Sequence, residues 1–373
     1  MWSRRDLEDN RVPLPASVER NTGTHFMKKR RRSKSRVTLH DVAKLAGVSP
    51  MTVSRFIDGS RSVRDSARVK AAIEELGYSP NAAARSLASA GTIKIGLLYG
   101  NPSATFTSEF LVDLLENSRR IGCQLVIEKC ASSRSEQGAA NKLLHEDVDG
   151  VILPTPACDS QALLRQFEQA SMPTVAVGTG RENAKGISLR IDNFRAAQEM
   201  TRYLLSLGHR DIGFILGHPR QIDSAQRYEG FVAAITAAGL RVSSKRVKQG
   251  QYTFRSGFNA ASQLLKRKDR PTAIFASNDD MAAGVLAAAH RIKLEVPRDL
   301  SIVGFDDTPL ASTIWPRLTT IRQPVNQLTR LALQLLVEDI RRRRSGKPSL
   351  QRQEVVKLTL VKRQSASANR GTR

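Results

Sequence analysis

Hydrophobic and polar residues follow two different patterns along this chain, and the change falls near residue 91. Before it, apolar residues recur at helical spacing in short stretches, such as Leu39, Val42, Ala43 and Ala46. After it, short apolar runs of the kind found in buried strands alternate with amphipathic helical stretches. The pattern therefore predicts a small all-helical domain followed by a larger α/β region.

The candidate strands of the α/β region form two series. The first series is 93–99, 125–127, 151–153 and 175–177, and after Asp192 the rhythm repeats with 212–216, 273–276 and 302–305. Strands separated by helices imply parallel, doubly wound sheets, so two series predict a two-lobed core. Beyond them we expect a long amphipathic helix at 325–344, a last strand at 355–360, and a polar, unstructured tail after Lys362.

Capping residues predict where the first two helices of the N-terminal domain begin and end. Thr38 with Asp41 forms a capping box, and Gly47 ends the first helix with a tight turn. Ser49 caps the second helix, and Pro50 takes its first helical position. A helix, a glycine turn and a second helix make a helix-turn-helix arrangement.

The second of these helices carries residues that suit a DNA groove. If its apolar side chains pack inward, the outward face consists of Pro50, Met51, Ser54 and Arg55. Arg55 can hold a guanine through two hydrogen bonds, whereas Met51 offers only apolar contact. Thr52 and Ser49 can bind phosphate, as can the backbone N–H groups at the helix start. The pattern alone leaves open an ordinary helical hairpin with a solvated arginine.

The segment 37–55, VTLHDVAKLAGVSPMTVSR, resembles the head of the lactose repressor (LacI) family of bacterial transcription regulators, and 75–81, ELGYSPN, continues the resemblance. It implies an all-α helix-turn-helix headpiece at 37–91 whose hinge, 81–89, folds on operator DNA. Leu87 matches a residue that wedges into the minor groove, as apolar side chains do at kinked steps. A helical linker that never touches DNA is the alternative. The candidate DNA contacts are Thr38, Ser49, Pro50, Met51, Thr52, Ser54, Arg55, Asn81, Arg85 and Leu87.

Further blocks extend the resemblance over roughly 37–363, namely 208–213, 277–284, 301–308 and 318–321. They imply that the core, 92–364, has a periplasmic-binding-protein-like fold with two doubly wound parallel sheets. In such a fold a small-molecule effector binds in the cleft between the lobes. The residues that match the effector contacts of the family are Phe106, Asp192, Arg227, Tyr252, Asn278 and Asp306.

The chemistry of these side chains suits a sugar. A carboxylate such as Asp306 accepts from two neighbouring hydroxyls, Arg227 donates to ring or carbonyl oxygens, and an aromatic ring stacks on a sugar face. Pro154 and Gly178 stand where the lactose-binding member has polar residues, so we do not expect a simple galactoside. A purine-like or other non-sugar effector is the alternative, and a structural ion pair is the alternative role for Arg227 and Asp306.

Positive charge is concentrated at the two ends of the chain. The net charge is +24; residues 1–36 hold 11 Lys/Arg and 4 Asp/Glu, and residues 341–373 hold 11 and 1. This distribution suits a polyanion partner, here double-stranded DNA, that the two ends of the chain contact. We expect 1–36 to be a disordered basic extension and 365–373 a disordered tail. Met27 is an alternative translation start to Met1.

The chain shows no pattern of an enzyme, since it has no Gly-rich phosphate loop, no Gly-x-Ser-x-Gly and no metal-spaced His/Cys set. We expect no catalytic residues, cofactor or metal ion. No apolar run approaches the roughly 18 residues of a membrane helix, and the first residues lack a signal-peptide pattern, so we expect a cytoplasmic protein with no membrane partner. A sugar-binding or transport protein would need such a signal and would not carry this head.

Assembly is also predicted from the C-terminal sequence. After the last predicted strand there is no leucine heptad with which to build a four-stranded coiled coil. We therefore expect a homodimer that reads a pseudo-palindromic operator. The predicted function is transcription regulation under the control of a bound effector. The family resemblance implies that the regulator is a repressor. The sequence leaves open the effector, the operator and whether the effector releases or promotes DNA binding.

Overall fold

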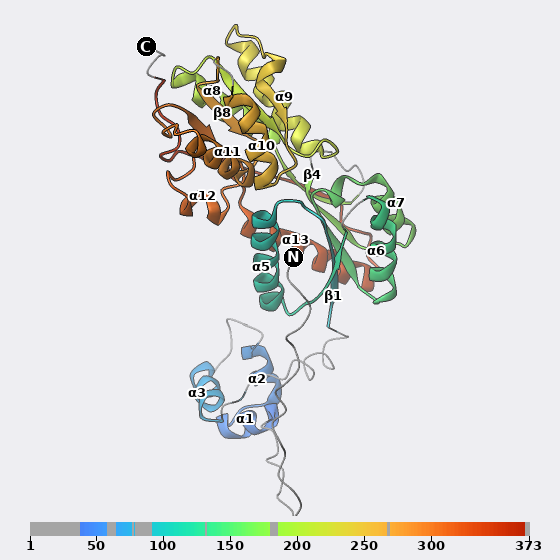
Figure 1. Cartoon of the computed structure of the whole chain (residues 1–373). Helices are drawn as coiled ribbons and strands as arrows, with labels where there is room; N and C mark the ends of the chain where they lie inside the picture. Colours follow the sequence, from blue (N-terminus) through green and yellow to red (C-terminus); the bar gives the residue numbers. More distant parts are fainter. Residues whose placement is uncertain are drawn as a thin grey trace, which may run out of the picture. The chain divides into compact units, whose positions relative to one another are not determined.

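The computed structural model describes residues 38–57, 65–76, 78, 92–130, 133–179, 186–266 and 269–369. The chain forms two compact units that divide after Ala88 (Figure 1). The basic extension predicted at 1–36 and the hinge predicted at 81–89 lie outside the described residues.

The described part of the first unit consists of three short helices, α1 (Leu39–Ala46), α2 (Pro50–Ile57) and α3 (Ser66–Leu76). Their buried apolar side chains are Val42, Ala43, Ala46, Val53, Val69 and Ala72. The capping box at Thr38 and Asp41 is present, and Gly47 takes a left-handed backbone with a φ of 66°. Glycine tolerates that conformation without steric cost, so α1 can end there and α2 can turn away. The predicted helix-turn-helix is confirmed.

The first lobe of the second unit is a six-stranded parallel sheet with helices on both faces. Its consecutive elements are β1 (Lys94–Tyr99), α5 (Ala104–Ile121), β2 (Gln124–Lys129), α6 (Ser133–His145), β3 (Gly150–Pro154), α7 (Gln161–Gln169), β4 (Thr174–Thr179) and β5 (Ile187–Ile191). The strand order is β11-β5-β4-β3-β1-β2, where β11 (Arg352–Val356) comes from near the end of the chain. All five residues of β3 are buried, as expected for a central strand covered on both faces.

The second lobe repeats this architecture with four parallel strands in the order β7-β6-β8-β9. Its elements are α8 (Asn193–Ser206), β6 (Ile212–Leu216), α9 (Ile222–Ala237), β7 (Val247–Gln249), α10 (Phe254–Leu265), β8 (Ala273–Ala276), α11 (Asp279–Arg291), β9 (Ser301–Val303) and α12 (Pro309–Thr313). Helices α8 and α9 cover one face of the sheet, and α10 and α11 cover the other. The predicted fold class of two doubly wound parallel sheets is confirmed.

The chain passes between the lobes three times within the described residues. It leaves the first lobe after β5, returns through β10 (Thr320–Arg322) to α13 (Val325–Arg344) and β11, and leaves again into β12 (Thr359–Val361). Strands β10 and β12 pair antiparallel beside the second lobe. The helix predicted at 325–344 has those bounds, and its apolar face packs into the core of the first lobe.

The single strand predicted at 355–360 is wrong. The chain bends there, so β11 pairs with β5 in the first lobe and β12 pairs with β10. Both pieces are short, and only Val355 and Val356 of β11 are apolar. A run of apolar residues does not show that its two halves join different sheets.

The unstructured tail predicted after Lys362 is also wrong, as far as Asn369. Ser365 is 1% exposed; its Oγ donates to the Ile302 carbonyl at 2.5 Å and accepts the Thr319 N–H at 2.8 Å. The tail is polar because its side chains satisfy backbone groups of the second lobe. Composition alone does not separate such residues from solvated ones.

We expect Ser365→Ala to lower the free energy of unfolding by about 1–3 kcal/mol, because a buried donor and a buried acceptor both lose their partner. Urea unfolding of the full-length protein measures this. Ser312→Ala, at an exposed serine of α12, is the matched control and should change stability by less than about 0.5 kcal/mol. Equal stabilities for the two variants would show that the tail contact contributes nothing.

Candidate functional site

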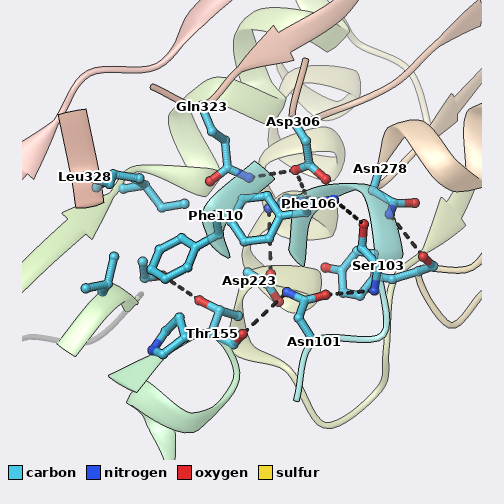
Figure 2. Close-up of a pocket in the computed structure, with 16 residues that line it drawn as sticks. Asn101, Ser103, Phe106, Phe110, Thr155, Asp223, Asn278, Asp306, Gln323 and Leu328 are labelled. Carbon is cyan, nitrogen blue, oxygen red and sulfur yellow. Dashed lines mark hydrogen bonds and ion pairs between the residues drawn. The ribbon is translucent and has the colours of Figure 1, made fainter. Parts of the chain in front are cut away.

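The carboxyl ends of the strands in both lobes border one cavity within the second unit (Figure 2). Its empty volume is about 470 Å³, part of which is open to solvent. The lining residues are Asn101, Ser103, Phe106, Phe110, Pro154, Thr155, Val177, Gly178, Ile191, Asp223, Arg227, Tyr252, Asn278, Asp306, Gln323 and Leu328. This edge of a parallel sheet is where ligands bind in α/β folds.

Most of the predicted effector contacts lie together in this cavity, namely Phe106, Arg227, Tyr252, Asn278 and Asp306. Asp192 is the exception. Its side chain is exposed, and its carboxylate accepts the Arg195 N–H at 2.8 Å as the N-cap of α8. An aspartate between a strand and a helix is a favoured cap, so this position has a structural role that its place in the sequence does not distinguish from a ligand contact.

Arg227, on α9, is the buried cation of the cavity. Its guanidinium lies 3.6 Å from a carboxylate oxygen of Asp223 and 3.6 Å from one of Asp306. It also donates to Asn193 at 2.9 Å and lies over the Phe305 ring, 3.7 Å from the centroid. These contacts fix its position, while both carboxylate distances exceed the 2.7–2.9 Å of a tight charge-assisted hydrogen bond.

Asp306 follows β9 and has a φ of 116°, a left-handed backbone held by hydrogen bonds to the residues around β10. Its carboxylate accepts from the Gln323 amide at 2.6 Å. Burial raises the pKa of Asp306 to about 7, although Arg227 and Gln323 oppose that shift. The carboxylate is therefore poorly compensated when the cavity holds only protein groups, and donors on a ligand would stabilise its charged form.

Tyr252 contributes a buried hydroxyl that makes no well-formed hydrogen bond to the described residues, although the Asp223 carboxylate lies near it. The ring lies against Gly217, where an added Cβ would come within 2.1 Å of it, so only glycine leaves room for the tyrosine. Burial raises the pKa of Tyr252 well above its usual value, which keeps the hydroxyl as a donor. A polar group of a ligand bound in the cavity would supply the hydrogen bond that this buried hydroxyl lacks.

The first lobe supplies an aromatic and polar wall opposite these groups. The ring centroids of Phe106 and Phe110 are 6.2 Å apart, and Figure 2 shows both beside Asn101 and Thr155. Pro154 and Gly178 line the same wall. The cavity thus combines a charged face from the second lobe with an aromatic face from the first.

Sequence reasoning missed several lining residues, and for some a signal existed. Asp223 lies one helical turn before Arg227, so the two share a helix face. Asn101 and Ser103 follow the carboxyl end of β1, a position that favours ligand contact. Gln323 had no signal, because the short strand β10 before it was not predicted.

A carboxylate on α11 bridges the two lobes at the edge of the cavity. Asp280, from the second lobe, accepts from the Ser103 hydroxyl at 2.8 Å and from the Thr105 hydroxyl at 2.8 Å, both in the first lobe. Ser103 also caps α5 by accepting the Phe106 N–H. These hydrogen bonds exist only while the lobes are closed on one another.

The first unit presents the predicted DNA-reading face of α2 to solvent. Val53 is fully buried, whereas Pro50, Met51 and Arg55 are exposed, and Met51 is 64% exposed. The Ser49 hydroxyl accepts the Thr52 N–H at 3.1 Å, so it caps the helix. The Ser54 side chain is not described, and the predicted contacts Asn81, Arg85 and Leu87 lie outside the described residues.

A helix-turn-helix head joined to a two-lobed core with a cavity between the lobes defines a class, the ligand-responsive DNA-binding regulators. Residues 38–81 match the sequence family described as "Bacterial regulatory proteins, lacI family", and residues 201–366 match "Periplasmic binding protein-like domain". The HTH-type transcriptional repressor PurR of Pectobacterium carotovorum subsp. carotovorum (strain PC1) is 36% identical over 335 residues, which cover 88% of this chain and 97% of the relative. The chain belongs to the LacI family of bacterial transcription regulators.

Other relatives agree with this assignment. Catabolite control protein A of Priestia megaterium is 33% identical over 306 residues, 81% of this chain and 92% of the relative. The complex of the transcriptional regulator CelR with cellobiose has a TM-score of 0.66 at 29% identity and covers 89% of this chain and 100% of its own. The lac repressor dimer bound to operator and the anti-inducer ONPF has a TM-score of 0.67 at 27% identity, covering 90% and 100%.

In the part of the chain that the structure describes, no helix combines the length and the apolar character that crossing a membrane requires. Within the same residues, no group of three or more His, Cys, Asp or Glu side chains is arranged to hold a metal ion.

We expect Asp280→Ala to open the lobes, because both hydroxyls lose a charged acceptor, each contact contributing about 1.5–3 kcal/mol to closure. Fluorescence energy transfer between labels at two exposed positions, Glu168 in the first lobe and Arg241 in the second, measures the distance without any ligand. Asp280→Asn, which keeps one acceptor oxygen, should lie between the parent and the alanine variant. Identical distances in all three proteins would contradict a closing role for Asp280.

Proposed function

We propose that this regulator is a dimeric repressor whose affinity for a pseudo-palindromic operator is set by a sugar or sugar derivative bound between the lobes. The observation that carries the proposal is the buried polar face of the cavity, where Arg227 lies between two carboxylates and beside the Tyr252 hydroxyl. The complex of the similar regulator CelR with cellobiose supports a saccharide.

The groups of this face match the hydroxyls of a neutral sugar. Asp223 and Asp306 accept hydrogen bonds, Arg227 donates them, and Asn278 and Tyr252 can do both. A hydroxyl also both donates and accepts, so neighbouring hydroxyls can satisfy this mixed set. A phosphate or carboxylate only accepts and would meet two carboxylates, which disfavours an anionic effector.

A purine-like effector is the second candidate. The similarity to repressors named PurR supports it, as does the aromatic wall of Phe106 and Phe110, since a planar ring stacks on such side chains. The polar face would then bind the ring nitrogens and exocyclic groups. The aromatic wall does not separate the two candidates, because sugars also pack against aromatic rings.

The DNA side of the proposal depends on the head. Arg55 and Met51 are exposed on α2, where a major groove would meet them. Two heads in a two-fold dimer would read two half-sites, in agreement with the similar lac repressor, which was solved as a dimer bound to operator. Such a function belongs in the compartment that holds the DNA, so we infer a cytoplasmic location.

We expect cellobiose or a related neutral saccharide to raise the melting temperature of the full-length protein, and hypoxanthine and guanine not to do so. A ligand at 100 times its dissociation constant stabilises by about 2.7 kcal/mol. Asp306→Ala should abolish the response and leave ligand-free operator affinity nearly intact. Thermal unfolding with each compound in turn measures the ligand response, and anisotropy titrations with operator DNA measure the affinity.

The matched control is Asp192→Ala, because Asp192 is exposed and does not line the cavity. It should respond like the parent protein. A response to a purine base and to none of the saccharides would establish the second candidate. If Asp306→Ala responds like the parent, the effector binds elsewhere.

We expect Arg55→Ala to weaken operator binding by about 1–3 kcal/mol and to relax the preference at one base pair per half-site, because a bidentate contact to guanine is lost. Selection of binding sites from random duplexes gives the preference, and anisotropy titrations give the affinity. Lys44→Ala, at an exposed position of α1, controls for loss of charge alone. Equal weakening on every sequence would make Arg55 a phosphate contact instead.

A further inference from the structure

The C-terminal end of α13 carries four consecutive arginines, 341–344, and the structure accounts for two of them. Arg343 donates to Asp339 at 2.8 Å, within the same helix. Arg344 donates to Asp149 at 2.6 Å, in the loop before β3. These two side chains tie the end of α13 to the first lobe.

Among the described residues, the remaining cations of this segment form no ion pair that ties the helix to the lobe, and Arg342 donates only to the Pro348 carbonyl, at 3.4 Å. Arg341, Arg342 and Lys347 form no ion pair with any residue in the described ranges, and Arg341 and Lys347 are exposed. Cations near a helix C-terminus stabilise it by about 0.3–1 kcal/mol each, which explains part of the pattern. Lys347 lies beyond the helix, however, and the last carbonyls already accept from the N–H groups of Ser345, Gly346 and Lys347.

The last turn of α5 ends beside this surface and carries two more exposed cations. Helices α5 and α13 lie side by side (Figure 1), and Ile121 borders a surface groove together with the cationic end of α13 and one exposed carboxylate, Glu338. Arg119 and Arg120 directly precede it and are exposed, and Arg120 reaches Glu116 only at 3.9 Å. We call this surface the basic rim; it consists of Arg119, Arg120, Arg341, Arg342 and Lys347.

The basic rim lies where the chain enters the core. The Asp149 carboxylate that binds Arg344 also accepts the backbone N–H of Lys94, the first residue of β1, at 2.8 Å. The residues just before β1 are the predicted hinge, 81–89. Only four residues lie between Ser89 and Lys94, so the chain that joins the predicted hinge to β1 spans at most about 17 Å when extended. The short connection therefore ties the predicted hinge to the end of the first lobe that carries the rim.

We propose that the basic rim binds the phosphate backbone of DNA next to the site that the head reads, an inference that depends on the DNA-binding function. Phosphates attract point charges on flexible stems without requiring a fitted surface. DNA is favoured over an acidic protein because the rim consists only of cations, whereas a protein interface buries an apolar centre. The exposed apolar side chains of α5, Val112 and Leu115, lie at least one turn before Arg119. The rim thus supplies sequence-independent affinity from the core.

The test compares the full-length parent with a variant in which Arg341, Arg342 and Lys347 are replaced by Gln. Anisotropy follows binding to a labelled duplex of arbitrary sequence, about 40 base pairs long, at several salt concentrations. Each phosphate contact contributes about 0.9 to the slope of log K against log salt, so the variant should lose up to about 3 in slope and bind roughly tenfold or more weakly. Arg341→Lys with Arg342→Lys should keep the parent slope.

The matched control replaces Arg241, Lys245 and Arg255, all exposed on the second lobe, by Gln, which changes the net charge equally. Its slope should stay that of the parent, and urea unfolding of both variants checks that each is folded. An unchanged slope in the rim variant would overturn the proposal. The rim would then either bind an acidic protein or be solvated without a partner. Equal losses in both variants would overturn it too, since net charge alone would then act. A parent that binds neither this duplex nor any duplex selected from random sequences would refute DNA binding itself.

Discussion

A guanidinium buried away from water is tolerated only when its charge and its N–H groups are met by protein groups, and the cavity is organised around that requirement at Arg227. Asn193, at the start of α8, and the Ser277 carbonyl, after β8, take two of its donors. Asp223 and Asp306 balance its charge from opposite sides. Because these partners come from different elements, one buried cation aligns much of the second lobe, and the same carboxylates remain available to a ligand.

The second lobe is fixed internally, whereas its relation to the first lobe depends on fewer and more exchangeable contacts. The lobes are joined by three passages of the chain and by the hydrogen bonds of Asp280 to two hydroxyls. Water can replace hydroxyl–carboxylate contacts, so an open arrangement of the lobes would lose few direct hydrogen bonds. A ligand that favours one state changes whatever else depends on lobe closure, and the coupling acts equally in both directions.

Local patterns predicted the elements well and the connections between them poorly. The capping residues of α1 and the apolar runs of β6 and β8 gave the observed bounds, because each depends on neighbours in sequence. The position of β11 beside β5 depends on residues far apart in the chain, and no periodicity encodes it. The same difference applies to the cavity. Resemblance located Arg227 and Asp306, but Gln323 reaches Asp306 only because the chain crosses between the lobes there.

Because β11 lies near the end of the sequence, it also determines when the protein can fold during synthesis. Arg352 pairs with Ile187, so the sheet of the first lobe lacks its edge strand until nearly the whole chain has left the ribosome. The second lobe likewise lacks the hydrogen bond from Ser365 to the Ile302 carbonyl until this part of the chain has been synthesised. Early segments therefore emerge with unfinished apolar surfaces, a condition in which nascent chains depend on chaperones. A prematurely terminated chain would carry the complete DNA-binding head without a finished core, and such a fragment is a target for proteolysis rather than a partly active regulator.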